Sequence, residues 1–220
     1  MARTRTYGDT CGIARALDVI GDRWALLIVR ELVFGPKRFG DLQAGLVRIG
    51  PDVLAQRLRD LEGAGLVERT ALPAPARVAA YRLTARGHEL EPVLQALGRF
   101  GSTLPLPESG PPLSVDATVM ALVTMFSPQR AGRLAARYEL WLGDEPFRLT
   151  VAEGRIDVER GRADEHDAVI TTTAASLAAI LWHGDSLDDA IEAGEVGIEG
   201  SRRLVDRFVR LFPLLSAAPR

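Results

Sequence analysis

The chain has 220 residues, of which 47% are hydrophobic and 6% aromatic, and its formal net charge at pH 7 is −2. This length and composition favour two modest hydrophobic cores over one large core. The polar first residues and the lack of a long apolar run predict a cytoplasmic protein with neither a signal peptide nor a membrane span, and the single cysteine excludes an internal disulfide.

The charge differs between the two parts of the chain. Residues 1–104 hold 15 Lys and Arg against 11 Asp and Glu, a net of +4, whereas residues 105–220 hold 12 against 18, a net of −6. A basic excess confined to one part is typical of a DNA-binding module joined to an acidic companion.

Three short helices are expected first. Residues 24–33 are strongly apolar and predict the first helix, which ends at Phe34-Gly35-Pro36. Residues 38–44 predict the second helix. After a tight connection, residues 51–62 predict an amphipathic helix that Pro51 begins and a Gly-Ala-Gly run ends. Its apolar stripe consists of Leu54, Leu58 and Leu61. Its opposite face carries Asp52, Gln56 and Arg59.

A two-stranded wing follows these helices. Residues 66–70 and 80–84 predict strands, joined by a loop whose Arg77 can reach a phosphate or the minor groove. Three helices and a wing in this order are the layout of a winged helix-turn-helix, a reader of double-stranded DNA. The alternative is a helical hairpin packed on a small sheet, with no role in DNA binding.

A domain boundary is expected after the next helix. Residues 89–100 predict a helix with an apolar stripe, and residues 101–112, rich in Gly, Ser and Pro, cannot continue it. We therefore expect an N-terminal domain at 1–104, a linker at 105–113 and a C-terminal domain at 114–220.

The C-terminal part predicts an α+β sandwich. Helices are expected at 116–125 and 129–136, followed by strands at 138–142, 147–151 and 155–160 as an antiparallel meander, a strand at 168–172, and helices at 174–182, 186–191 and 201–212. The predicted fold class is thus α+β: an N-terminal winged helix-turn-helix, then an antiparallel sheet covered by helices.

Six segments of the first hundred residues resemble the HxlR family of bacterial transcriptional regulators. They are residues 11–14 (CGIA), 17–24 (LDVIGDRW), 34–39 (FGPKRF), 54–58 (LAQRL), 65–67 (GLV) and 81–84 (YRLT). The resemblance implies a dimeric repressor or activator at an inverted-repeat operator. It also implies pairing through the first helix and the helix at 89–100.

The predicted DNA contacts fall on the helices and the wing. Gln56 and Arg59 are expected at base edges, and the backbone contacts are expected from Lys37, Arg38, Arg57 and Arg77. A salt bridge is the alternative use of Arg57, because it flanks the apolar stripe. The chain departs from the family pattern at Gly50, Asp52 and Ala55, where polar or basic residues are usual, and each departure removes a possible DNA contact.

Cys11 matches a position that acts as a thiol sensor in some members of that family. A cysteine near a dimer interface can form an intersubunit disulfide or an adduct if its thiolate is stabilised. The alternative is a small buried packing residue.

The C-terminal part resembles the sterol carrier protein type 2 fold. The matching segments are residues 153–156 (EGRI), 167–170 (DAVI), 177–185 and 193–200 (AGEVGIEG). The resemblance implies an apolar tunnel for a hydrophobic ligand, and a solid core is the alternative. The residues expected to line the tunnel are Phe126, Leu140, Leu142, Ile180, Trp182, Phe208 and Phe212.

Two functions remain open from the sequence. The first is a transcriptional regulator, a homodimer on DNA whose C-terminal domain senses a small hydrophobic effector. The second is a carrier of hydrophobic ligands whose winged helix serves only dimerisation or protein contact. Neither a phosphate loop, a nucleophile elbow nor a cluster of metal-ligating residues occurs in the sequence, so we expect no catalytic activity, metal or cofactor.

Overall fold

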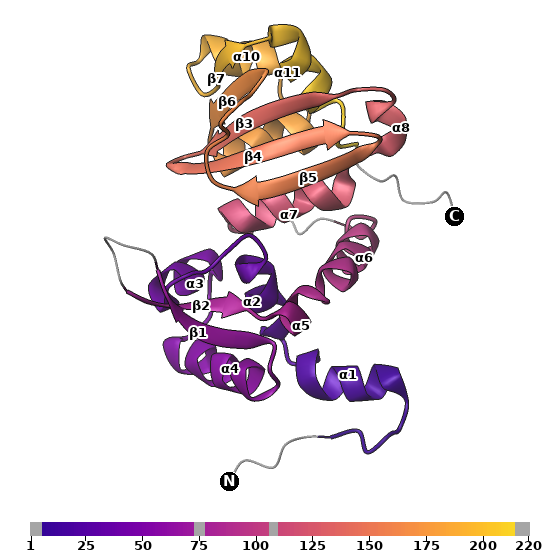
Figure 1. Ribbon diagram of the computed structural model, residues 1–220, viewed down its shortest axis with the longest axis vertical. Coiled ribbons are helices and arrows are strands. Elements are labelled where there is room, and N and C mark those ends of the chain that lie inside the picture. The colour runs from indigo at the N-terminus through magenta and orange to yellow at the C-terminus, as the bar shows by residue number, and fades with distance from the viewer. Residues whose placement is uncertain (1–5, 73–77, 106–109, 214–220) are drawn as a thin grey trace. The chain divides into compact units, whose positions relative to one another are not determined.

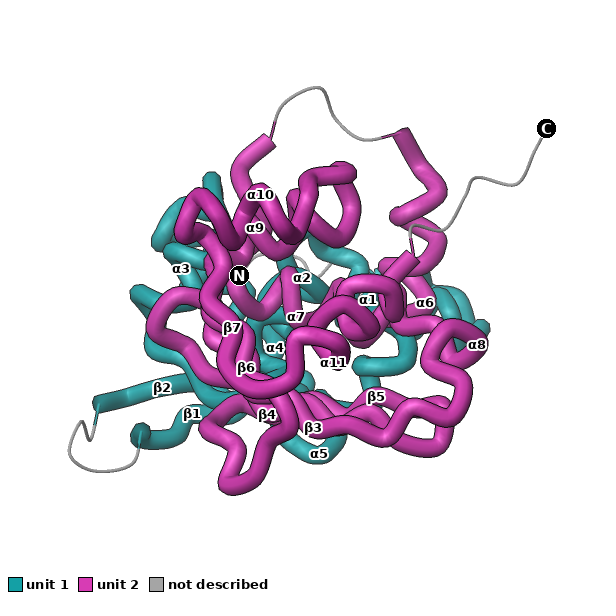
Figure 2. Tube along the Cα trace, turned by 90° about the horizontal axis from the view of Figure 1, so that it is seen from above, with its two compact units in different colours: residues 1–94 teal, residues 95–220 magenta. Residues whose placement is uncertain are grey.

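The computed structural model describes residues 6–72, 78–105 and 110–213 (Figure 1). The chain forms two compact units, residues 1–94 and 95–220, coloured separately in Figure 2. Helix α6 (Glu91–Gly101) spans this division. The predicted linker at 105–113 lies partly outside the described residues and stays a prediction. No helix in the described ranges is both long and apolar enough to cross a membrane.

The N-terminal unit is a winged helix-turn-helix, as predicted. In chain order it contains α1 (Gly12–Ile20), α2 (Ala25–Leu32), α3 (Phe39–Gly45), α4 (Pro51–Gly63), β1 (Val67–Ala71), β2 (Ala79–Leu83) and α5 (Ala85–His88). Both wing strands lie within one residue of their predicted positions. The wing is antiparallel, with Val67 opposite Leu83, and Lys37 forms an isolated bridge to Tyr81 on β2.

A leucine-rich core holds this unit together. Ile28 and Leu32 of α2, Leu42 of α3, and Leu54 and Leu58 of α4 are each at most 1% exposed. Burying one such side chain contributes about 1.5–3 kcal/mol. The core therefore fixes the orientation of α4 relative to α2 and α3.

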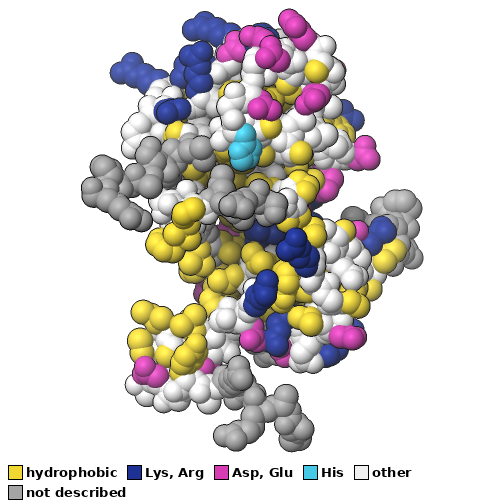
Figure 3. All heavy atoms as spheres, turned by 180° about the vertical axis from the view of Figure 1, so that it is seen from behind, with side chains coloured by type: hydrophobic (Ala, Val, Ile, Leu, Met, Phe, Trp, Pro, Cys, Tyr) yellow, Lys and Arg dark blue, Asp and Glu magenta, His cyan; other side chains and the backbone are white. Residues whose placement is uncertain are grey.

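Helix α1 packs differently from the other helices. None of its residues is buried, and Ile13 and Leu17 are 73% and 42% exposed. Figure 3 shows hydrophobic side chains gathered over this helix, at lower left. The helix thus presents an apolar face to solvent.

The C-terminal unit is a sheet packed against helices. Its elements are α7 (Val115–Met125), α8 (Pro128–Ala131), β3 (Ala136–Leu142), β4 (Glu145–Ala152), β5 (Arg155–Arg160), β6 (Ala168–Thr172), α9 (Ala174–Ala178), the π-helix η1 (Ala179–His183), α10 (Leu187–Glu192), β7 (Gly197–Gly200) and α11 (Arg202–Val209). The strand order is β5-β4-β3-β6-β7.

The sheet is mixed, so the prediction of an antiparallel sheet is wrong at one pair. Strands β3, β4 and β5 form the predicted meander, but β6 runs parallel to β3. The chain returns from β5 to the far side of β3 through residues 161–167. The Glu139 carboxylate accepts a hydrogen bond from the Ala163 N–H at 2.6 Å, and Asp167 accepts one from the Arg137 N–H at 2.8 Å. These contacts fix a crossing segment that brings β6 in alongside β3.

Three smaller predictions also need correction. The helix expected at 129–136 ends at Ala131, because Gly132 has a φ of 57° and β3 begins soon afterwards. The helix expected at 174–182 is α-helical only to Ala178 and continues as η1, which ends at Gly184. Strand β7 was not predicted, since its glycine-flanked sequence has little strand propensity.

The inner face of the sheet is closed by aromatic packing. Tyr138 and Phe208 are fully buried, with ring centroids 5.0 Å apart, and Phe208 lies 5.0 Å from Phe212. The Tyr138 hydroxyl donates a hydrogen bond to the Leu204 carbonyl at 3.1 Å. Burial raises the pKa of Tyr138 to about 12.

This raised pKa predicts a pH dependence of stability. In the unfolded chain a tyrosine ionises near pH 10, whereas folded Tyr138 keeps its proton to about pH 12. The contribution of Tyr138 to the free energy of unfolding is therefore complete below pH 10 and is lost as the pH rises from 10 to about 12. Urea unfolding at several pH values should show the fall in the wild type and a shallower one in Tyr138→Phe. An equal fall of the unfolding free energy with pH in both proteins would contradict the raised pKa of Tyr138.

Candidate nucleic-acid interface

The outward face of α4 is the surface that the sequence assigns to base reading. Leu54, Leu58 and Leu61 are at most 1% exposed and hold the helix on the core. Gln56 and Arg59 are exposed on the other side. The helix begins at Pro51 as predicted, and the structure makes Gly50 its N-cap.

The two predicted base-reading side chains contact each other. An Arg59 guanidinium N–H donates to the Gln56 side-chain oxygen at 2.7 Å, and the Gln56 amide donates to Asp60 Oδ1 at 2.7 Å. Arg59 has no carboxylate within ion-pairing distance among the described residues. Its remaining donors are therefore available for the two acceptors that guanine presents in the major groove.

Arg57 is held by acidic neighbours. Its guanidinium forms ion pairs with Asp22, in the loop before α2, and with Asp60 at 3.0 Å. These contacts correspond to the salt-bridge alternative for Arg57. The pair with Asp22 also ties α4 to the segment that follows α1. Its predicted contact with the DNA backbone stays a prediction.

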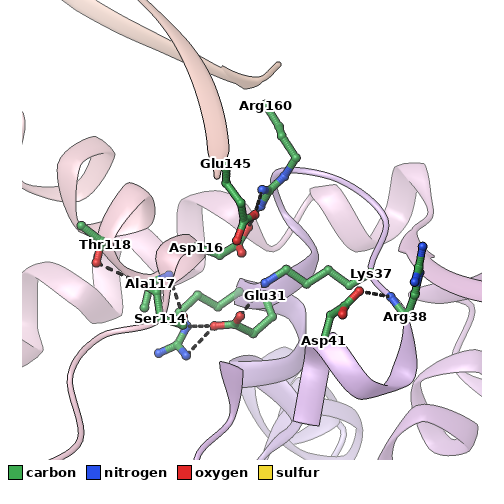
Figure 4. Close-up of polar contacts among 11 residues, drawn as sticks. Glu31, Lys37, Arg38, Asp41, Ser114, Asp116, Ala117, Thr118, Glu145 and Arg160 are labelled. Atoms are coloured by element: carbon green, nitrogen blue, oxygen red, sulfur yellow. Dashed lines mark hydrogen bonds and ion pairs between the residues drawn. The ribbon is translucent and has the colours of Figure 1, made fainter. Parts of the chain in front are cut away.

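Lys37 and Arg38 occupy different environments. The Lys37 ammonium lies 2.8 Å from Glu31, whose side chain is fully buried, and Lys37 itself is only 12% exposed (Figure 4). Arg38 is exposed at the start of α3, where its backbone N–H donates to Asp41 at 3.2 Å. In Figure 4 the Arg38 side chain points away from Asp41. Of the two, Arg38 is therefore the better placed to meet a phosphate.

The departures from the family pattern have local structural uses. Asp52 lies in the first turn of α4, where a carboxylate stabilises the positive end of the helix dipole by about 0.3–1 kcal/mol. Ala55 is half-buried beneath the outward face. Gly50 provides no side-chain cap. The first turn of α4 is thus less suited to DNA than its middle.

The wing contributes fewer cations than its sequence suggests. Arg69 pairs with Glu62 at 3.0 Å, and Arg82 pairs with Glu68 at 2.7 Å. Arg77 lies outside the described residues.

One basic residue of this surface was missed by sequence reasoning. Arg48 is exposed in the turn between α3 and α4, with a φ of 78°. Its place in the tight connection at 47–50 was a usable signal. The strained backbone was not, because no sequence pattern marks an arginine with positive φ.

Cys11 lies at the N-cap of α1 and is exposed, so the buried-packing alternative is wrong. The backbone N–H groups of Ile13 and Ala14 lower the pKa of its thiol. A helix N-terminus favours a thiolate for the same reason that it favours other anions.

The predicted ligand-lining residues are mostly core residues. Leu140, Leu142, Phe208 and Phe212 are at most 1% exposed, Ile180 is 7% exposed, and Phe126 and Trp182 are half-buried. A pocket of about 420 Å³ lies beside β3, β4 and residues 163–165, and none of the seven predicted ligand-lining residues lines it. It is lined by Arg137, Tyr138, Arg148, Leu149, Thr150, Ala163, Asp164 and Glu165.

Comparison with known proteins divides the chain in two. The family model described as HxlR-like helix-turn-helix matches residues 19–107, and the one described as alkyl sulfatase C-terminal matches residues 112–216. The second family differs from the sterol carrier protein named from the sequence. That finer resemblance therefore stays a prediction.

Individual relatives match the N-terminal part. An uncharacterized HTH-type transcriptional regulator from Synechocystis sp. is 41% identical over 96 residues, which cover 43% of this chain and 70% of the relative. The HTH-type transcriptional regulator YodB from Bacillus subtilis is 38% identical over 82 residues, covering 37% of this chain and 73% of YodB.

Two solved structures each match part of the chain. Quinone-bound YodB is 32% identical, covers 42% of this chain and 97% of its own, and gives a TM-score of 0.37. A double mutant of the sec-alkyl sulfatase PisA1 is 20% identical, covers 48% of this chain and 17% of its own, and gives a TM-score of 0.44.

Proposed function

The chain belongs to the family of HxlR-like helix-turn-helix transcriptional regulators, and from this premise we propose that it binds an inverted-repeat operator as a homodimer, with α4 of each copy in the major groove. One observation carries the proposal. The outward face of α4 exposes Gln56 and Arg59, with an arginine that no carboxylate of the described residues neutralises. Such a helix matches the shape and acceptors of a major groove.

The exposed apolar faces of two helices support the homodimer. Ile13 on α1 is 73% exposed, and Val93, Leu97 and Phe100 on α6 are 41%, 47% and 65% exposed. Removing apolar surface from water is favourable by about 25 cal/mol per Å², before the entropic cost of association is subtracted. A second copy offers the same faces, as a twofold interface requires.

A salt titration of binding to the chain's own upstream DNA tests the proposal. A regulator should bind one duplex with a Kd of roughly 10⁻⁸ M or below at physiological salt, and each neutralised phosphate should add about 0.9 to the slope of log K against log salt. The carrier alternative predicts weak retention that is equal on an unrelated duplex of the same length. Equal, weak binding to both duplexes would contradict the proposal.

We propose further that Cys11 senses electrophiles or oxidants. The exposed thiol, its lowered pKa and its position on the exposed helix α1 support this role. The relative YodB has been solved with a bound quinone, an electrophile of the kind that a thiolate attacks.

The lowered pKa predicts fast alkylation of Cys11 by iodoacetamide. Because only the thiolate reacts, the rate should rise with pH, and its midpoint should lie below that of the same cysteine in the urea-unfolded chain. Mass spectrometry of the adduct over time measures both rates. Coincident midpoints would show that the helix N-terminus has no effect on this thiol.

The C-terminal unit is proposed to bind a small hydrophobic effector. Two buried polar atoms support this role, because the Thr172 hydroxyl and the Trp182 indole nitrogen have no hydrogen-bond partner among the described residues. A bound ligand with polar groups next to these two atoms would supply the missing partners. Native mass spectrometry of protein purified from its host should reveal a bound apolar compound, and repeated ligand-free spectra would favour the solid-core alternative.

A further inference from the structure

The turn between α3 and α4 contains a strained arginine. The Ile49 N–H donates to the Leu46 carbonyl at 3.0 Å, which closes a four-residue turn with Arg48 in third place. Arg48 has a φ of 78°. A positive φ at this place in a turn normally requires glycine, because a Cβ atom crowds the backbone there.

The residues on either side leave the turn little freedom to relax. Leu46 and Ile49 are 2% and 6% exposed and anchor both sides of the turn in the core, whereas Val47 is 47% exposed. Arg48 is exposed as well, so its side chain gains no packing in return for the strained backbone. Glycine would satisfy the same turn without a Cβ atom.

The charge of Arg48 is also not used by any of the described residues. No carboxylate among the described residues lies within ion-pairing distance of its guanidinium. Two other cations of this unit differ, since Lys37 contacts Glu31 and Arg57 contacts Asp60. Within the described part of the chain, Arg48 therefore presents a guanidinium without an acidic partner two residues before the N-cap of α4.

We propose that Arg48 binds a phosphate of the DNA backbone next to the groove that α4 enters. This inference rests on the proposed function and adds a contact to it. Strained residues cluster at functional sites, and a guanidinium matches two phosphate oxygens at once. In helix-turn-helix proteins the first residues of the reading helix approach the bases, so the preceding turn lies close to the phosphate ridge.

Two substitutions separate strain from charge. Arg48→Gln keeps the Cβ atom and removes the charge, so it should weaken DNA binding roughly tenfold at about 0.1 M salt and leave the Tm unchanged. Arg48→Gly removes both, so it should weaken binding equally while raising the Tm by several degrees. Both variants should reduce the salt slope by about 0.9 per chain.

Glu153 provides a matched control. It is the other non-glycine residue with positive φ among those described, at 52°, and it lies in the turn between β4 and β5. Glu153→Gly should raise the Tm in the same way and leave DNA binding unchanged. A loss of DNA binding in this control would show that relief of turn strain alone impairs binding, and would overturn the inference.

Failure of the Arg48 contact and failure of the proposed function give different binding results. Because a phosphate contact is blind to sequence, Arg48→Gln should lose affinity equally for the operator and for an unrelated duplex. Unchanged affinity in both Arg48 variants, or a loss confined to the operator, would overturn the phosphate contact and leave the proposed function standing. Failure of the wild type to prefer any duplex would instead overturn the proposed function, and this inference with it.

Discussion

Replacement of Arg59 by alanine removes one bidentate base contact in each half-site at about 1–3 kcal/mol per contact, so operator binding by the dimer is expected to weaken by about two to four orders of magnitude. Gln56 accepts a hydrogen bond from Arg59 at 2.7 Å and so limits the orientations of the guanidinium before DNA arrives. Fluorescence anisotropy with the operator and with a base-substituted operator measures the change. The loss should be much smaller on the substituted site, where the wild type lacks the same contact.

Arg202→Ala is the matched control for this prediction. Arg202 is an exposed arginine of α11, in the C-terminal unit, and contacts Asp188 and Asp206 at 2.5 and 2.8 Å. Its removal should leave DNA affinity unchanged. If Arg59→Ala lowered affinity equally for every duplex, Arg59 would be a backbone contact, and base reading by α4 would lose its main residue.

The second large effect concerns the core beneath α4. Leu58→Ala should lower the unfolding free energy of the N-terminal unit by about 2–5 kcal/mol, because Leu58 is 1% exposed and its truncation leaves a cavity. Calorimetry should show a lower Tm for the transition of this unit. Val53→Ala is the control on the same helix, since Val53 is 44% exposed. Equal Tm shifts in the two variants would contradict the assignment of the buried face.

Much of the N-terminal fold could be predicted from local sequence. The spacing of Leu54, Leu58 and Leu61 sets the buried face of α4, and Pro51 sets its start. Both wing strands were predicted within one residue, because alternation and turn residues are strong local signals. These features depend on residues a few positions apart.

The sheet of the C-terminal unit was harder to predict. The parallel pairing of β3 with β6 depends on how residues 161–167 cross the sheet, and contacts such as that between Glu139 and Ala163 join residues far apart in sequence. Strand β7 gains its order from pairing with β6 and not from its own composition. Such tertiary contacts override local propensity.

At the DNA-binding surface, too, contacts between separate elements could not be predicted from the sequence. The sequence indicated which residues of α4 face outward, but not that Asp22 and Asp60 hold Arg57, nor that buried Glu31 holds Lys37. Ion pairs between separate elements become visible only when the elements are placed. The left-handed backbone of Arg48, between the buried residues Leu46 and Ile49, likewise becomes visible only in the folded chain.

Protection of guanine N7 from dimethyl sulfate tests the central claim most directly, because N7 lies in the major groove. On its own upstream DNA, the wild type should protect guanines in two half-sites separated by about 10 base pairs or a multiple of that spacing. Arg59→Ala should lose that protection at one guanine in each half-site. Binding of the wild type with every guanine N7 still reactive would contradict the placement of α4 in the groove.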